Sequence, residues 1–461
     1  MDATAQKVII GRVKRPDQTY GDGAVWVTGE TIGRVTAGRP DGADLEGHEV
    51  IDVGDSFVLP GAVDAHVHCY SALEEGMAAA TASAVAGGVT TIVEMPFDAD
   101  GPVNTVERLQ RKFDLVANEA VGDVAVLATL APGGGWREAG NLAAHGAVGF
   151  KLSLFHTDPN RFPRIDDAEL LDAFGAIAET GLTVCVHAEN NEIVQKLSAE
   201  MADADPLDPL THVRTRPPVS ETLGVLTAME LAHTQGTRLH LCHMSVPRAI
   251  DLAAWFHANG TDVTAETCTH YLTFTAEDMQ EQRARLKINP PLRSADDREG
   301  MWERVGNGAI QLLTSDHAPW PLERKSHAEI LKNASGAPGV ELLPTRCLGE
   351  ALRRDPRPEG LFDRVVTALT SAPADRYRFG HRKGRLAAGH DADVMVFTPD
   401  ADHVVRASDQ HSNAGWTPYE GLRPGGSVTL TLSRGEVVWD AATGALAGPG
   451  RGALVRPEVA P

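Results

Sequence analysis

The segment VLPGAVDAHVH, residues 58–68, is an apolar run that ends in two histidines one residue apart. Seven further short apolar runs follow, separated by helix-length segments rich in alanine and leucine. They are VTTIVEMP (89–96), VAVLATL (124–130), AVGFKLSL (147–154), LTVCVHAE (182–189), RLHLCHMS (238–245), DVTAETCTHYL (262–272) and IQLLTSDHAPW (310–320). Most lack polar alternation, which is typical of parallel strands buried on both faces. Eight such strands with intervening helices predict an α/β fold, a (β/α)8 TIM barrel, with a doubly wound sheet as the alternative.

The two ends of the chain follow a different pattern, in which short β-rich runs alternate with Gly and Asp turns. This pattern covers residues 1–59 and returns over residues 385–445. We expect these two segments to pair into one small, discontinuous β-sandwich domain. Residues 60–384 would then form the barrel, and the Pro- and Gly-rich residues 446–461 would form a C-terminal tail on the surface.

The composition restricts the partners of the protein. The 461 residues carry a formal net charge of −21, which disfavours nucleic acid and anionic membranes as partners. Five cysteines without a CxxC spacing predict reduced thiols. No apolar run approaches the roughly 18 residues of a membrane span, and MDATAQKVII, residues 1–10, lacks the features of a signal peptide. We therefore expect a cytoplasmic protein that acts on a small molecule.

Polar side chains stand where the apolar runs stop, which in a barrel is the C-terminal mouth, where active sites lie. Six of them belong to residue types found in metal centres: His66, His68, Lys151, His187, His243 and Asp316. Each has an ordinary structural interpretation, such as a rim histidine, a lysine that reaches solvent or an aspartate that caps a helix. Because all six fall on or at the end of predicted strands, the joint pattern indicates a metal site.

Lys151 interrupts the fourth apolar run, where an ammonium would be a poor neighbour for metal ions. Burial near positive charge is expected to lower its pKa, and a neutral amine is able to add carbon dioxide and form a carbamate. The two oxygens of a carbamate are able to bridge two metal ions about 3.5–4 Å apart, as in two-metal hydrolases. The six residues together therefore predict a binuclear centre with N6-carboxylysine at position 151.

Five segments resemble the amidohydrolase superfamily, and within it the cyclic amidohydrolases: allantoinase, hydantoinase/dihydropyrimidinase and dihydroorotase. They are VDAHVH (63–68), GFKLSLFH (149–156), VHAEN (186–190), LHLCHMS (239–245) and LLTSDHAPW (312–320). The resemblance covers nearly the whole chain. It also implies a homo-oligomer, specifically a tetramer.

The resemblance implies two divalent metal ions with separate ligands: His66, His68 and Asp316 for the first, His187 and His243 for the second. Carboxylated Lys151 and a hydroxide would bridge the two ions. Histidine-rich ligands favour zinc, with cobalt, manganese or iron as substitutes.

The resemblance also assigns catalytic and substrate-binding roles. Asp316 would take the proton of the attacking hydroxide and pass it to the departing ring nitrogen. His156, five positions after Lys151, would help to hold the tetrahedral oxyanion. Main-chain groups near Asn289 and Ser335 would hold a cyclic ureide. Asp64 either orients a metal-binding histidine or caps a strand end.

Allantoin, opened to allantoate, is the substrate that the motifs favour, because FKLSLFHTDPNRFP, residues 150–163, resembles one branch of the allantoinases. Dihydroorotases carry an arginine two residues after the HxH motif, where this chain has Tyr70, so that activity is disfavoured. The short loop over residues 69–88 resembles some hydantoinases, and 5-substituted hydantoins, dihydropyrimidines and cyclic imides stay alternatives. A non-catalytic scaffold is the distant alternative, which the retained ligand residues disfavour. His270 lines the pocket or caps a strand, and His240 is structural.

Overall fold

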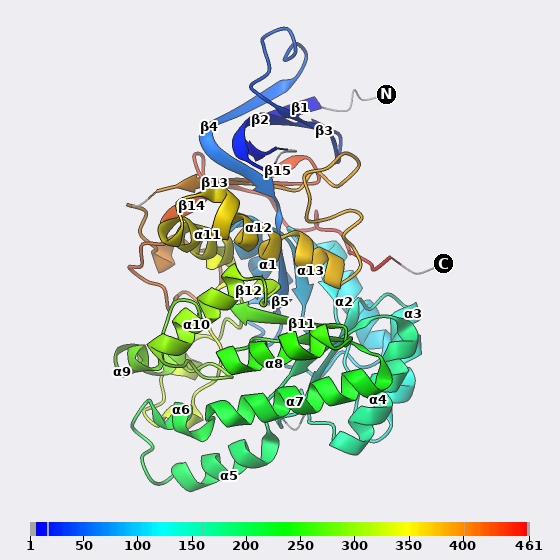
Figure 1. The fold of residues 1–461 in the computed structure, drawn as a ribbon, viewed down its shortest axis with the longest axis vertical. Coiled ribbons are helices and arrows are strands. Elements are labelled where there is room, and N and C mark those ends of the chain that lie inside the picture. The colour runs from blue at the N-terminus through cyan, green and yellow to red at the C-terminus, as the bar shows by residue number, and fades with distance from the viewer. Residues whose placement is uncertain (1–5, 16–17, 159, 401, 459–461) are drawn as a thin grey trace.

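The structure of the chain, a computed structural model, describes residues 6–15, 18–158, 160–400 and 402–458. Figure 1 shows a β-sheet body near the N-terminus and, beneath it, a larger body of strands wrapped by helices. Residues 1–5, which are part of the segment used to argue against a signal peptide, lie outside the described residues. Across the described ranges, none of the helices has the length and apolar character that a bilayer span requires.

One eight-stranded sheet joins the two ends of the chain, in the order β16-β15-β14-β13-β4-β1-β2-β3. Its strands are β1 (Gln6–Lys14), β2 (Tyr20–Thr28), β3 (Thr31–Ala37), β4 (Glu49–Pro60), β13 (Val394–Pro399), β14 (Gly426–Ser433), β15 (Glu436–Asp440) and β16 (Ala445–Leu446). Pro60 at the end of β4 lies opposite Val394 at the start of β13. Because these strands pair directly, the terminal segments share one continuous sheet instead of the two separate sheets expected of a β-sandwich. The domain boundaries at residues 59 and 385 stay a prediction.

A two-residue turn joins β14 to β15 and fixes this edge of the sheet. Arg434 and Gly435 have φ of 46° and 77°, the left-handed values that mirror-image hairpin turns need. A Cβ on Gly435 would lie 2.1 Å from the carbonyl oxygen of Gly29. Glycine is therefore required where this hairpin meets the turn after β2.

Eight parallel strands form the larger body, and each corresponds to one of the apolar runs predicted from the sequence. They are β5 (Ala62–Val67), β6 (Val89–Glu94), β7 (Asp123–Val126), β8 (Gly149–Ser153), β9 (Thr183–His187), β10 (Arg238–Leu241), β11 (Val263–Cys268) and β12 (Leu312–Thr314). β5 to β7 form one sheet and β8 to β12 another. Isolated parallel bridges link the sheets at both seams, Ala128 to Phe150 and Val67 to His317.

Helices cover the outside of these strands (Figure 1). They are α1 (Gly76–Ala86), α2 (Val106–Glu119), α3 (Ala139–Ala144), α4 (Asp167–Thr180), α5 (Asn191–Met201), α6 (Thr211–Thr215), α7 (Pro218–Gln235), α8 (Pro247–Ala258), α9 (Met279–Gln282), α10 (Ala295–Gly306), α11 (Leu343–Arg354), α12 (Asp363–Leu369) and α13 (Ser371–Arg376). In α4, Leu170, Phe174 and Ile177 are buried at the three- and four-residue spacing of one helix face. The side chain of Asp166 accepts from the backbone N–H of Glu169 and starts this helix.

The C-terminal tail is attached to the parallel strands. Leu454 forms a parallel bridge with Val124 in β7, and the Val455 side chain is buried. The backbone N–H of Ala453 also donates to Asp123 at 2.8 Å. The tail therefore covers the N-terminal end of β7, opposite to the strand ends that carry the predicted metal ligands.

Candidate active site

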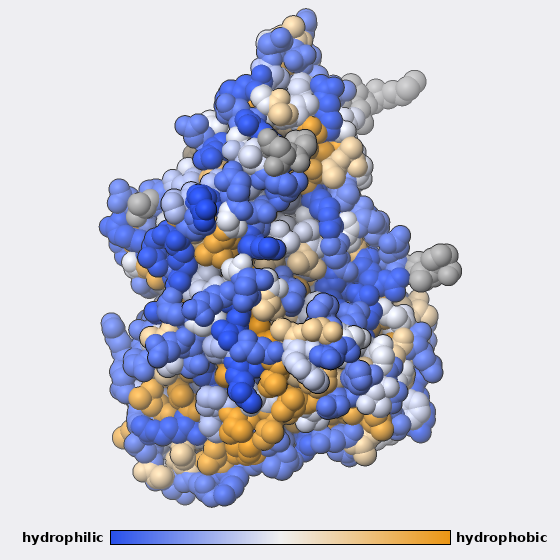
Figure 2. Space-filling view, viewed as in Figure 1, coloured by the Kyte–Doolittle hydropathy of each residue, from blue (hydrophilic) through white to orange (hydrophobic). Residues whose placement is uncertain are grey.

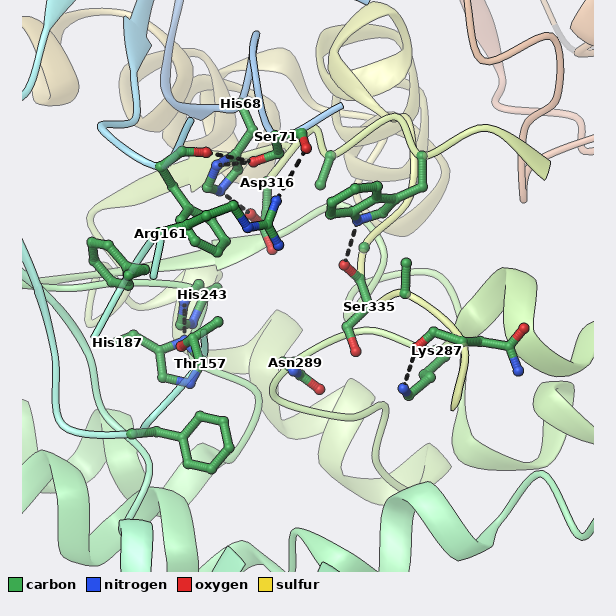
Figure 3. A pocket seen from close by; sticks show the side chains of 18 of the residues that line it. His68, Ser71, Thr157, Arg161, His187, His243, Lys287, Asn289, Asp316 and Ser335 are labelled. Atoms are coloured by element: carbon green, nitrogen blue, oxygen red, sulfur yellow. Dashed lines mark hydrogen bonds and ion pairs between the residues drawn. The ribbon is translucent and has the colours of Figure 1, made fainter. Parts of the chain in front are cut away.

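A cavity of about 390 Å³ opens at the carboxyl ends of the parallel strands (Figure 3). Its wall includes all six predicted metal-centre residues: His66, His68, Lys151, His187, His243 and Asp316. Asn289 and Ser335 line the same cavity. The fold thus brings together residues that the sequence spreads over 270 positions, from residue 66 to residue 335.

The first cluster consists of His66, His68 and Asp316, whose ligand atoms lie close enough to share one metal ion. Nε2 of His66 is 3.3 Å from Oδ1 of Asp316, and Nε2 of His68 is 3.4 Å from the same oxygen. The two histidines point to one side because they are two residues apart on or beside β5. The bridge between Val67 and His317 brings Asp316 beside them. Two imidazoles and a carboxylate at this spacing suit a divalent cation.

The second cluster consists of His187, which ends β9, and His243, which follows the neighbouring strand β10. Nδ1 of His187 lies 3.0 Å from Nε2 of His243. The His243 ring is 5.3 Å from the His66 ring, centroid to centroid, so the two clusters are adjacent. Nζ of Lys151 is buried in this region and has no hydrogen-bond partner among the described residues. This orphaned amine fits a carbamate at Lys151, which would add two oxygen ligands to the histidine set.

The protonation states of the site suit metal binding. Burial would raise the pKa of Asp316, but the His66 and His68 imidazoles outweigh it and hold this pKa at about 2. Burial lowers the pKa of His68 to about 4 and lowers the pKa values of His187 and His243 as well. At neutral pH the carboxylate is ionised and these three imidazoles are neutral, which are the forms that coordinate metals.

The expected lowering of the Lys151 pKa is wrong for the chain without metal ions. Burial disfavours the ammonium, but the Cys242 sulfur and the Glu266 carboxylate favour it more strongly, so the pKa is raised. Cations bound beside the amine would act in the opposite direction. Burial alone therefore does not supply the neutral amine that a carbamate at Lys151 would need.

Two site residues occupy strained backbone conformations. His243 has a φ of 44° and Asp316 a φ of 46°, values that are uncommon for residues other than glycine. His243 lies two residues after the end of β10, and Asp316 lies two residues after the end of β12. Such strain concentrates at functional sites, where the surrounding structure holds it in place.

Glu266 is a site residue that sequence reasoning missed. Nδ1 of His66 lies 2.6 Å from one of its oxygens, and Nε2 of His240 lies 2.9 Å from the other. The same carboxylate accepts the backbone N–H of His243 at 3.0 Å. A carboxylate behind a metal-binding imidazole fixes its tautomer and orientation. The only signal in the sequence is an acidic residue inside the buried run VTAETC, residues 263–268.

Glu189 holds His187 in the same way. Oε2 of Glu189 lies 2.8 Å from Nε2 of His187, and the same carboxylate forms a buried ion pair with Arg216. Asp64 instead accepts the backbone N–H groups of His66 at 3.1 Å and Ser315 at 3.2 Å. Of the two roles considered for Asp64, the structure therefore favours fixing strand ends over orienting a histidine ring.

His156, the residue expected to hold the oxyanion, is not among the residues that line the cavity. Its side chain is exposed, and its neighbours Phe155 and Thr157 line the cavity instead. The backbone N–H of His156 donates to the Asn191 side chain at 3.1 Å. Because alternate residues of this extended turn face opposite sides, the position nearest the cavity is one residue away from the predicted one.

The other predicted contacts are placed as follows. The Asn289 side-chain oxygen is buried and has no partner in the part of the chain that the structure describes. The Ser335 carbonyl accepts from Nε1 of Trp320 at 2.8 Å. His270 is buried near Asp316, and its Nε2 has no partner within the described ranges, but it does not line the cavity. His240 is fully buried against Glu266, in agreement with a structural role.

Parallel strands wrapped by helices, with a histidine- and aspartate-lined cavity at their carboxyl ends, define an α/β enzyme with a metal-type site. The model of the amidohydrolase family matches residues 57–438. An allantoinase from Rubrobacter xylanophilus is 35% identical over 422 residues, which cover 90% of this chain and 91% of that protein. The chain therefore belongs to the amidohydrolase family.

Two further similar proteins are named as hydantoinases. An L-hydantoinase from Paenarthrobacter aurescens is 32% identical over 416 residues, 88% of this chain and 89% of that protein. The solved structure of an L-hydantoinase (dihydropyrimidinase) from Arthrobacter aurescens has a TM-score of 0.92 and 29% identity. It covers 98% of this chain and 100% of its own.

Proposed function

We propose that the protein hydrolyses the cyclic amide bond of a cyclic ureide, with allantoin as substrate and allantoate as product. The observation that carries this proposal is the meeting of two histidine clusters, Asp316 and the orphaned Lys151 amine on one cavity wall. The identity with the Rubrobacter allantoinase over nine-tenths of both chains supports allantoin as the substrate.

We propose that two divalent ions, zinc in the first instance, complete the site. His66, His68 and Asp316 would hold one ion, His187 and His243 would hold the other, and carboxylated Lys151 would bridge them. When bound, the ions would polarise the amide carbonyl and supply hydroxide at neutral pH. The neutral imidazoles and the ionised Asp316 support this assignment.

Asp316 is the proposed proton carrier. A water oxygen adds to the ring carbonyl carbon, and Asp316 receives the proton that the water loses. The C–N bond then breaks, and Asp316 returns the proton to the ring nitrogen, because an amide nitrogen leaves poorly as an anion. The acyl carbon leaves as a carboxylic acid, which loses the second water proton to solvent and becomes a carboxylate, and the former ring nitrogen carries a new N–H bond. Main-chain groups near Asn289 and Ser335, on the far side of the cavity, would hold the ureide ring (Figure 3).

We also propose that the eight parallel strands close into a complete (β/α)8 barrel. The isolated bridges at the two seams support closure, and so does the TM-score of 0.92 with the Arthrobacter hydantoinase. Closure of the barrel would place β12 beside β5, and so explain why Asp316 lies beside His66 and His68.

A hydantoinase is the second candidate function, because the structure that matches with a TM-score of 0.92 and one of the curated relatives are L-hydantoinases. Dihydroorotase is disfavoured. The hydroxyl of Tyr70, which stands where an arginine would be expected, donates to Glu119 at 3.0 Å, and Tyr70 is not part of the cavity wall.

We propose a homo-oligomer, a tetramer by family resemblance. Figure 2 shows hydrophobic residues grouped where Figure 1 places α4, α7 and α8. Exposed apolar side chains of these helices include Leu171, Val219, Leu223 and Trp255, the last with 60% of its surface exposed. Sedimentation of the purified protein measures the assembly directly, and a monomer would contradict the proposal.

The proposed function is tested by metal analysis and a substrate panel on one preparation. We expect close to two divalent ions per chain and turnover of allantoin above 5-substituted hydantoins, dihydrouracil and cyclic imides. Lys151→Ala should lower both metal content and turnover, because it removes the bridging group. Full activity with one ion or none, or wild-type behaviour of Lys151→Ala, would contradict the binuclear centre.

A further inference from the structure

The cavity wall carries an excess of positive charge in an acidic protein. Besides Lys151, its cationic side chains are Arg161, Arg216, Lys287 and Arg324. Among the described residues of the wall, Asp316 is the single carboxylate, although the whole chain has a formal net charge of −21. Positive side chains that the proposed chemistry does not use therefore line the cavity.

Two of these cations, Arg216 and Lys287, already bind protein groups, and a third, Arg324, is exposed to solvent. Arg216 forms a buried ion pair with Glu189. Lys287 donates to the carbonyls of Leu331 and Asn333, and burial lowers its pKa to about 7. Arg324 is an exposed residue whose guanidinium lies 4.8 Å from the Trp320 ring.

Stacking and hydrogen bonds fix the Arg161 guanidinium, and its Nη2 group is left to bind a ligand. Its guanidinium lies between two aromatic rings, 4.7 Å from Phe97 and 5.5 Å from Trp320. Nε donates to Asp158 at 3.1 Å and Nη1 donates to the Ser71 carbonyl at 3.3 Å. Nη2 has no acceptor among the residues that the structure describes. An arginine fixed by stacking and two hydrogen bonds needs little ordering before it binds an oxygen.

The position of Arg161 is opposite to the proposed ring-binding segment. The carbonyl of Ser71 accepts from Arg161, and the hydroxyl of Ser71 lies 3.1 Å from Nδ1 of His68, a proposed metal ligand. Figure 3 shows Arg161 beside His68, Ser71 and Asp316, with Asn289 and Ser335 across the cavity. A ring held at Ser335 with its reacting carbonyl at the metal site would direct one of its substituents toward Arg161.

We propose that Arg161 determines specificity by binding an oxygen-bearing substituent of the substrate ring, a ureido carbonyl or a carboxylate. This inference rests on the proposed function and defines its substrate class. An alkyl or aryl substituent would displace water from Nη2 without offering an acceptor in its place. Sites built to hydrogen-bond a substrate group discriminate strongly against analogues that lack it.

The test compares the kcat/KM for allantoin, hydantoin-5-acetate and 5-isopropylhydantoin, each divided by the value for unsubstituted hydantoin. In Arg161→Met, the ratios for the first two should fall by about 10- to 100-fold, since one hydrogen bond to a charged donor is lost. The ratio for 5-isopropylhydantoin should stay constant or rise. A fall for allantoin identifies the ureido carbonyl as the partner, and a fall for hydantoin-5-acetate alone identifies a carboxylate.

Arg137→Met is the matched control. Arg137 also stacks on a tryptophan, 4.3 Å from the Trp136 ring, and its Nη1 also donates to a backbone carbonyl, that of Gly134. It lies outside the cavity wall, so its substitution should leave all ratios unchanged. Arg161→Lys keeps the charge without the planar fork, and should preserve the carboxylate ratio better than the ureido ratio.

Metal content is measured on every variant, because Arg161→Met should retain the wild-type amount. Unchanged ratios in Arg161→Met, with hydantoin still opened, would overturn the role of Arg161 and leave the proposed function intact. If the wild-type protein with its full metal content opened no cyclic ureide, the proposed function would fail, and this inference with it.

Discussion

Asp316 lies within 3.4 Å of two imidazole nitrogens and has the backbone strain typical of a functional residue. Asp316→Asn keeps the shape and one weak ligand oxygen but removes the proton acceptor. We expect kcat to fall by about 10²–10⁴, because general acid–base steps have this magnitude, while much of the metal stays bound. Measuring kcat, metal content and melting temperature on one batch separates this role from a helix cap. A variant that melts early but turns over normally would contradict it.

Glu266 offers a second residue-scale prediction, because it binds His66 and His240 without touching the substrate cavity. Glu266→Gln should weaken the metal affinity by about 10- to 100-fold, as substitutions behind metal-binding histidines do. Competition with a chelator measures the affinity. Glu94→Gln is the control, since Glu94 is equally buried but pairs with Lys112 at 2.6 Å. Equal metal affinities in the two variants would refute the role of Glu266.

At the scale of the element, α11 ends in a cluster of charges around Glu350. This buried carboxylate accepts from Arg346 at 2.9 Å, from Nε of Arg353 at 2.8 Å and from Arg354 at 2.7 Å. Burial alone would raise the pKa of Glu350, but Arg353 and Arg346 hold it at about 2. The folded state therefore binds the proton more weakly than the unfolded chain does.

Glu350→Gln should lower the free energy of unfolding at pH 7 by about 2 kcal/mol. The folded pKa is depressed, so this contribution is complete above the unfolded value and is lost as pH falls from about 5 toward 2. Urea unfolding at pH 7 and pH 4 measures the difference between wild type and variant, which should shrink at pH 4. Glu303→Gln, exposed on α10, is the control. A difference that stays constant between the two pH values would contradict the prediction.

Elements also show what the sequence was able to predict. The eight parallel strands were predictable from unbroken apolar runs. A strand that is buried on both faces needs apolar residues at successive positions, so the local sequence alone reveals it. The six residues proposed for the metal centre were found from their positions on or at the end of the predicted strands. Glu266 was not, since its relation to His66 exists only after β5 and β11 are placed around the same cavity. The direction of the exposed His156 side chain was not predictable either, because a single residue of offset in an irregular turn reverses the direction of a side chain.

At the scale of the whole molecule, Lys383 joins the terminal sheet to the parallel strands. Its buried amine lies 2.5 Å from Asp123 at the start of β7, 2.9 Å from Asp391 and 2.8 Å from Asp393 next to β13. Removing this cation would leave three buried carboxylates with two remaining cations, Arg434 at 3.3 Å from Asp123 and Arg382 at 2.9 Å from Asp391. A buried ion pair broken on one side typically costs about 3–5 kcal/mol.

Lys383→Met should therefore lower the melting temperature far more than Lys196→Met, which changes a largely exposed lysine on α5. Adding Asp393→Asn to Lys383→Met should recover part of the loss, because one unpaired charge disappears. Scanning calorimetry of the three variants measures both effects. Equal melting temperatures for Lys383→Met and Lys196→Met would show that this junction does not stabilise the molecule.

The pairing of β4 with β13 also governs how the protein is made. The ribosome produces Pro60 early and its partner Val394 only after all the parallel strands have emerged. At about 5–20 residues per second, the exposed edge of β4 waits tens of seconds for its neighbour. During that interval the nascent chain displays unpaired backbone groups that are prone to aggregation. Slower initiation and ample chaperone supply during expression should therefore raise the yield of folded protein more than faster synthesis does.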